Sequence, residues 1–150
     1  MGEGSNLRVR LLGTWQLVSA VIRFEDGELR NQFGDDAYGF LIYSADGYVR
    51  AVLGARDRAA IASDAPAKTT DAESAGEEVR FLACCGPFTV DEERSAVKHS
   101  IEVSLSPSWL GREEMRAASF VGEQLVLTTD SRLSRDGRMS RVEVTWKRPG

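Results

Sequence analysis

Near its start the chain carries Gly13-Thr14-Trp15, directly ahead of the long strand-like run 17–24. A glycine at such a point lets the backbone bend sharply into a sheet. The tryptophan then supplies one large apolar ring that can fill the floor of a barrel. The tripeptide therefore predicts the first strand of a closed barrel, with Trp15 buried near the closed end.

Further strand-like segments follow along the chain, separated by turn signals such as the hairpin turn 44–47. They cover residues 29–33, 38–43, 48–53, 87–90, 97–105, 114–121, 124–129 and 141–147. About eight or nine strands joined mostly by short turns favour an all-β fold, a single antiparallel barrel that leaves no strand edge exposed. At 150 residues the chain is long enough for one such domain. We expect the barrel to span 7–149 and residues 1–6 to form a disordered tail.

One helix is expected within this barrel, over residues 71–84. Thr70 and Glu73 have the spacing of a capping box. Apolar residues at helical spacing follow, namely Ala75, Val79, Leu82 and Ala83. The helix should flank or cap one end of the barrel, and the loop 54–70 should form a lid with it.

Charge and composition limit the classes of partner. The net charge of −4 argues against nucleic acid and anionic membrane surfaces, which need clustered cations. No apolar run approaches the length of a membrane span, and no secretory signal is visible at the N-terminus. We therefore expect a cytoplasmic protein without a nucleic-acid or membrane partner.

Metal and cofactor chemistry has no sequence support. The chain holds a single histidine, His99, and two adjacent cysteines, Cys84 and Cys85. That set cannot build a Cys/His zinc site. Neighbouring Cα atoms also lie too close for a relaxed disulfide, so two free thiols are expected at the end of the helix. Gly-x-Ser-x-Gly, P-loop and Rossmann motifs are all missing. We expect no metal and no cofactor.

Strand alternation places two polar side chains of interest. In the segment 97–105, His99 shares the apolar, inward face. It is either a core histidine bonded to a neighbour or part of a ligand site. Arg116 shares a face with Ala118, but both faces of its strand are mixed. If buried, its guanidinium needs an anion, either Glu114 or a carboxylate or enolate of a ligand. If the strand faces the other way, Arg116 is solvated.

Several stretches together resemble the lipocalin-like domain family, which comprises small bacterial and fungal barrels of the calycin type. The spacing His-x-x-Glu-x-Ser-Leu-x-Pro-x-Trp from His99 to Trp109 is the most specific of them. The matching stretches are LLGTWQLVS at 11–19, FGDDAYGFLIYSADGYV at 33–49, VKHSIEVSLSPSWLG at 97–111, EQLVLTT at 123–129 and VTWKR at 144–148. The resemblance implies that Lys147 or Arg148 stacks on the ring of Trp15.

The resemblance also implies a cavity that holds a small, mostly apolar molecule. Binding of a hydrophobic metabolite is the first function it suggests. A cofactor-free cyclase or isomerase of polyketide secondary metabolism, of pericyclase or oxa-cyclase type, is the second, because restraint and a few hydrogen-bond donors suffice for such chemistry. A structural or protein-binding barrel with a filled core is the third. The sequence leaves open whether the protein forms a homodimer.

The expected site combines polar and apolar residues. In the enzyme interpretation Tyr43 or Arg116 donates to an oxygen that gains negative charge, and His99 accepts or relays a proton. The expected ligand-binding residues are apolar, namely Leu17, Leu41, Val97, Ile101, Val103, Trp109 and Phe120.

Overall fold

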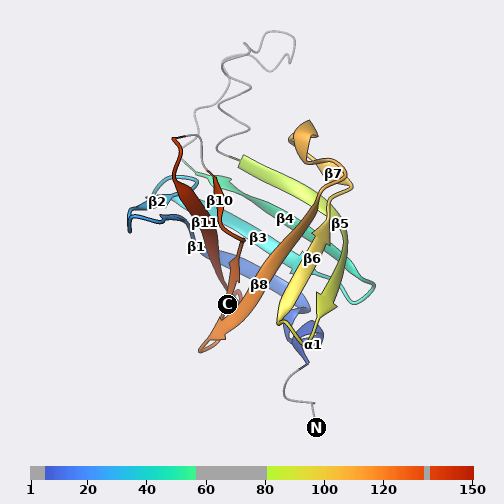
Figure 1. Cartoon of the computed structure of the whole chain (residues 1–150). Helices are drawn as coiled ribbons and strands as arrows, with labels where there is room; N and C mark the ends of the chain where they lie inside the picture. Colours follow the sequence, from blue (N-terminus) through green and yellow to red (C-terminus); the bar gives the residue numbers. More distant parts are fainter. Residues whose placement is uncertain (1–5, 57–80, 134–135) are drawn as a thin grey trace.

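The computed structural model of the chain, which describes residues 6–56, 81–133 and 136–150, is an antiparallel barrel (Figure 1). Eight of the described strands close it, because β1 pairs with β3 on one side and with β11 on the other. These strands are β1 (Gly13–Phe24), β3 (Ala37–Tyr43), β4 (Tyr48–Ala55), β5 (Phe81–Asp91), β6 (Ala96–Ser100), β8 (Glu113–Val121), β9 (Gln124–Thr128) and β11 (Met139–Lys147). Three short strands add to the wall, namely β2 (Leu29–Asn31), β7 (Val103–Ser104) and β10 (Arg132–Leu133). The predicted all-β barrel is confirmed.

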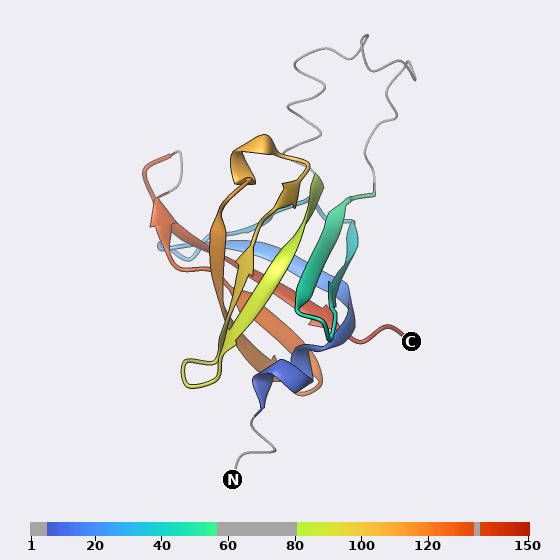
Figure 2. The ribbon, with the colours of Figure 1, turned by 90° about the vertical axis from the view of Figure 1, so that its right-hand side faces the viewer.

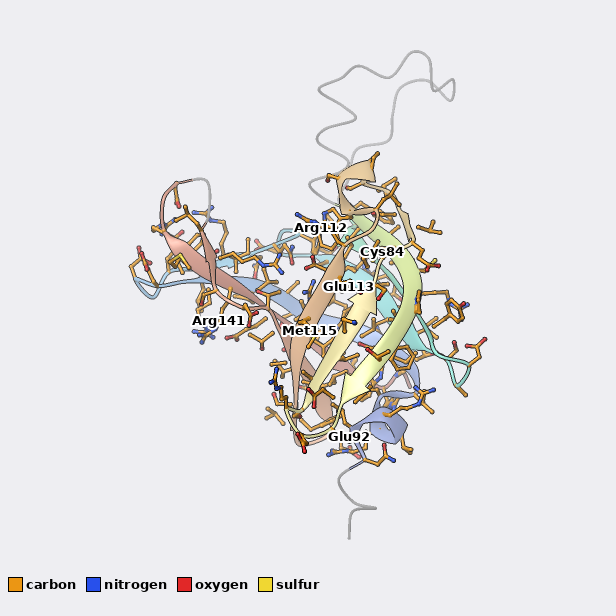
Figure 3. The ribbon with its side chains drawn as sticks, turned by 45° about the vertical axis from the view of Figure 1, so that its right-hand side comes forward. Cys84, Glu92, Arg112, Glu113, Met115 and Arg141 are labelled. Carbon is orange, nitrogen blue, oxygen red and sulfur yellow. The ribbon has the colours of Figure 1, made fainter. Side chains whose placement is uncertain are left out.

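A short helix, α1 (Leu7–Leu11), covers one end of the barrel, which we call the floor (Figure 2). Asn6 caps it by accepting a hydrogen bond from the backbone N–H of Val9 at 3.1 Å. Glu92, in the β5–β6 turn (Figure 3), accepts a hydrogen bond from the backbone N–H of Leu7 at 2.7 Å. These carboxylate and amide oxygens satisfy helix N–H groups that have no partner inside the helix. The sequence analysis did not predict this helix.

Trp15 is buried in the floor, as expected, and is only 2% exposed. Its indole N–H donates to the carbonyl of Leu11 at 2.8 Å, which ties the ring to α1. The guanidinium of Arg148 lies 3.7 Å from the ring centroid and donates to the carbonyl of Arg10 at 2.9 Å. The cation–π contact expected at the end of the last strand is therefore confirmed, with Arg148 as the cation.

The expected helix over 71–84 is wrong where the structure describes that segment. Residues 81–84 belong to β5, in which Leu82 pairs with Leu53 and Cys84 pairs with Ala51 of β4. Pairing into a closed sheet satisfies the backbone of 81–84, and it outweighs the apolar spacing that suggested a helix. Cys84 and Cys85 are free, as expected, but they lie in a strand.

Other expectations fall outside the described residues. They are the helix over 71–80, most of the lid loop 54–70, and the disordered tail up to residue 5. Gly54 and Ala55 at the start of that loop belong to β4 instead. Among the described helices, none is long and apolar enough to cross a membrane.

Val103 was expected on the inward face, and this expectation is wrong. Its side chain is 62% exposed. On β5, two residues lie between Cys85 and Phe88, whereas three lie between their partners Val103 and His99. The extra residue is a bulge, and a shift of one residue turns every later side chain to the opposite face.

Gly86 makes room for this bulge. A Cβ atom at Gly86 would stand 1.8 Å from the carbonyl oxygen of Ser100. Only a residue without a side chain allows the two backbones to approach so closely. Ile101 and Glu102 then separate β6 from β7, and Glu102 donates its N–H to the carbonyl of Cys85 at 2.9 Å.

Candidate functional site

The barrel encloses a cavity of about 260 Å³ in its half away from α1. Its volume lies just below the range of about 300–1,000 Å³ that is usual for small-molecule sites. At the end of the barrel opposite the floor, Trp109 of the 3-10 helix η3 (Pro107–Trp109) and Ser140 of β11 line the cavity. Apolar side chains supply most of the remaining wall, namely Phe33, Leu41, Ala51, Leu53, Leu82, Ile101, Leu127, Val142, Val144 and Trp146. The core is therefore not filled by side chains throughout.

The structure brings together part of the expected ligand-binding set. Leu41, Ile101 and Trp109 line the cavity. Leu17 and Val97 are buried in the core but do not line it. Phe120 packs near the floor, with its ring centroid 6.3 Å from that of Trp15. Val103 faces solvent, because of the bulge.

Two of the three expected polar residues, His99 and Arg116, line the cavity. Tyr43 stands behind His99, is 1% exposed, and its hydroxyl lies 2.6 Å from His99 Nε2. Burial, with a smaller effect of the nearby Arg116 charge, lowers the pKa of His99 to about 3. Burial likewise raises the pKa of Tyr43 well above its ordinary value. Both groups are thus neutral at pH 7, and His99 is a much weaker base than its ordinary pKa would make it.

Arg116 faces inward and is paired with the internal carboxylate that the sequence offered. Its Nη1 donates to Glu114 Oε1 at 3.0 Å, and Arg132 Nη2 donates to the same oxygen at 3.0 Å. Glu114 is 5% exposed. Glu113 and Met115, on either side of it in β8, have exposed side chains (Figure 3). The mixed pattern of β8 is therefore settled by an ion pair on the inner face.

Glu114 is ionised at neutral pH. Burial raises its pKa, but hydrogen bonds from Arg132 and Arg116 outweigh burial and leave the pKa below the ordinary value of a glutamate. The cavity wall thus contains a three-membered cluster of Glu114, Arg116 and Arg132, which we call the charged cluster.

Further wall residues carry polar atoms that the sequence analysis did not place there, namely Gln32, Cys84, Thr129, Ser140 and Trp146. The indole Nε1 of Trp146 is buried and has no hydrogen-bond partner in the part of the chain that the structure describes. Burial raises the pKa of the Cys84 thiol to about 11, so it is protonated at pH 7. The described residues contain no group of three or more side chains that could hold a metal ion.

A periodic signal existed for one of the missed residues. Trp146 alternates with Val144 and Val142 along β11, and all three line the cavity. Arg132 lies in the two-residue strand β10, which is too short to show a period. Cys84 was missed because its segment was taken as a helix.

A family model described as a lipocalin-like domain matches residues 12–149. No curated protein matches the chain.

Proposed function

The chain belongs to the lipocalin-like domain family, and we propose that it binds a small, mostly hydrophobic metabolite inside the barrel. The cavity of about 260 Å³ carries this proposal. Concave sites lined by apolar side chains and a few polar groups are where proteins usually bind small molecules. Here the polar groups include His99, the charged cluster and the indole N–H of Trp146, together with the side chains of Gln32, Thr129 and Ser140.

The neutral Tyr43–His99 pair favours binding over acid–base chemistry. The hydroxyl of Tyr43 and Nε2 of His99 are already hydrogen-bonded to each other at 2.6 Å. A general base works best with a pKa near the working pH, and the pKa of His99, at about 3, is far below it. We assign to the pair the role of a fixed, polar part of the wall.

The binding proposal is tested with an uncharged fluorescent probe, N-phenyl-1-naphthylamine. Its emission should rise when it enters the wild-type cavity. Ala51→Phe places a ring in the wall of the cavity, because Ala51 lines it. We expect this variant to raise the dissociation constant at least about tenfold, or about 1.4 kcal/mol. Val52→Phe is the matched control, since Val52 is the next residue of β4 and is 48% exposed.

Two results would refute the binding proposal. One is the absence of probe binding to folded wild-type protein. The other is equal weakening by Ala51→Phe and Val52→Phe, because a surface site would not distinguish the two faces of β4.

A cofactor-free cyclase or isomerase is the second candidate, supported by the donors in the wall. The guanidinium of Arg116 and the indole N–H of Trp146 belong to a cavity wall that is mostly apolar. Such donors stabilise an oxygen that gains negative charge during a reaction. The test incubates linear polyketides with wild-type protein and with Arg116→Met. Faster, stereoselective product formation that Arg116→Met slows without loss of binding would favour the enzyme. Equal rates with and without protein would favour the carrier.

A further inference from the structure

The cavity wall carries an excess of positive charge. Its charged members among the described residues are Glu114, Arg116 and Arg132. Two guanidiniums and one carboxylate leave a net charge of +1. His99 and Cys84, the other titratable groups that line the cavity, are neutral at pH 7. An anionic ligand would therefore cancel this excess, whereas a cation would add to it.

The two guanidiniums are only partly used by protein groups. Both donate to one oxygen of Glu114 at 3.0 Å, so they converge on the same point. Arg116 also donates to the carbonyl of Met115 at 3.2 Å. A guanidinium has five N–H donors. The remaining N–H groups of Arg116 and Arg132 have no partner within the described part of the chain.

One further polar atom of the wall also favours an acceptor, whereas the side chains of Gln32, Thr129 and Ser140 can donate or accept. Trp146, 3% exposed, presents a buried N–H without a partner in the described residues. The hydroxyl of Tyr43 and Nε2 of His99 already satisfy each other. An alkane would leave these donors unpaired, and unpaired buried donors are costly.

From this arrangement we propose that the ligand is a small apolar molecule with one carboxylate, held by Arg116 and Arg132. Arg132 comes from β10 and is partly exposed, with 52% of its side chain accessible, whereas Arg116 is 16% accessible. The carboxylate therefore lies beside the charged cluster, and the apolar body lies against Leu41 and Leu53. This inference rests on the proposed function, because it requires a ligand in the cavity.

The test compares two competitors of equal chain length at pH 7.5, decanoate and 1-decanol. Each is titrated against bound N-phenyl-1-naphthylamine. Because charge-assisted hydrogen bonds are stronger than neutral ones, we expect decanoate to displace the probe at a concentration at least about tenfold lower than 1-decanol needs. Displacement by 1-decanol at the same or a lower concentration, or by neither compound, overturns the carboxylate inference. In both of those cases probe binding itself still decides the proposed function separately.

Three variants locate the carboxylate. Arg132→Met should weaken decanoate about tenfold and leave 1-decanol unchanged, because Arg132 is half exposed and its loss removes only one donor group. Arg141→Met is the control, since Arg141 pairs with Glu143 away from the cavity, and it should change neither competitor. Glu114→Gln removes the carboxylate that occupies both guanidiniums, and it should strengthen decanoate binding. Equal decanoate affinities in wild type and Arg132→Met overturn the inference even if Glu114→Gln fails to fold.

Discussion

The hydroxyl of Tyr43 lies 2.6 Å from Nε2 of His99, and both side chains are buried. The bond joins β3 to β6 across the interior. On one side His99 lines the cavity, and on the other Tyr43 packs edge-on against Phe88, with ring centroids 4.8 Å apart. The pair thus marks the boundary between the packed floor half and the hollow half of the barrel.

The titration of His99 is the first prediction. Because burial holds its pKa near 3, the imidazole should stay neutral from pH 7 down to about pH 4. His99 is the only histidine of the chain, so its ring signals in NMR spectra are assigned without ambiguity. A titration midpoint near the ordinary 6.5 would show that the ring is hydrated and the barrel wall looser than described.

A second prediction concerns stability against pH. The pKa of His99 is lower in the folded chain than its ordinary 6.5, so acid favours the unfolded chain. The resulting stability is complete above pH 6.5 and is lost as the pH falls from 6.5 towards 3. The slope should approach about 1.4 kcal/mol per pH unit. Urea unfolding of wild type and His99→Gln at several pH values isolates this contribution, because other groups cancel. Parallel curves for the two proteins would contradict it.

Tyr43→Phe provides a third prediction. The variant keeps the buried ring but leaves His99 Nε2 without its partner. Loss of such a partner costs about 1–3 kcal/mol of unfolding free energy. Tyr48→Phe is the control, because Tyr48 is 50% exposed and should change stability by less than about 0.5 kcal/mol. Equal effects of the two variants in chemical denaturation would mean that the hydrogen bond contributes nothing.

Gly86→Ala tests the bulge that turns Val103 outward. The added methyl would overlap the carbonyl oxygen of Ser100, which belongs to the backbone and cannot rotate away. We expect a loss of stability of at least about 2 kcal/mol, measured by thermal and chemical unfolding. Thr89→Ala, at an exposed position of the same strand, should cost under about 1 kcal/mol. A Gly86→Ala protein as stable as wild type would refute the close approach of the two strands.

Several elements of the fold were predictable from local sequence. The floor is one of them, because the Gly13-Thr14-Trp15 tripeptide and the cations at the end of the last strand each have a distinct chemistry. The hairpin turn at 44–47 is another, where Gly47 adopts φ 97° and donates its N–H to Ser44 at 3.0 Å. Such features depend on residues close in sequence, or on residue types with few alternatives.

The alternation of apolar and polar residues could not predict shifts of one residue in strand register. A bulge between Leu17 and Ser19 moves the first strand out of phase, so Ala20 is buried where alternation from Trp15 and Leu17 would place Ser19. The bulge before Val103 acts in the same way. Bulges depend on backbone approach between strands distant in sequence, and Gly86 signals one only when its neighbour Ser100 is known.

The candidate site was predictable only in part for a related reason. His99 follows a clear strand pattern, and the sequence also named Glu114 as a partner for Arg116, although both faces of their strand are mixed. Arg132 joins that cluster across 18 residues, from a strand too short to have a period. Tertiary pairing alone places it in the wall.

The central claim is that a ligand enters the cavity, and methyl NMR of leucine-labelled protein tests it most directly. N-phenyl-1-naphthylamine is added to the wild-type chain, and its aromatic rings shift the signals of nearby methyl groups. We expect the largest shifts at leucines that line the cavity, namely Leu41, Leu53, Leu82 and Leu127. Leu29 and Leu110, which are 54% and 52% exposed, should not move. Shifts confined to Leu29, Leu110 or other surface leucines, with the four lining leucines unchanged, would contradict the account.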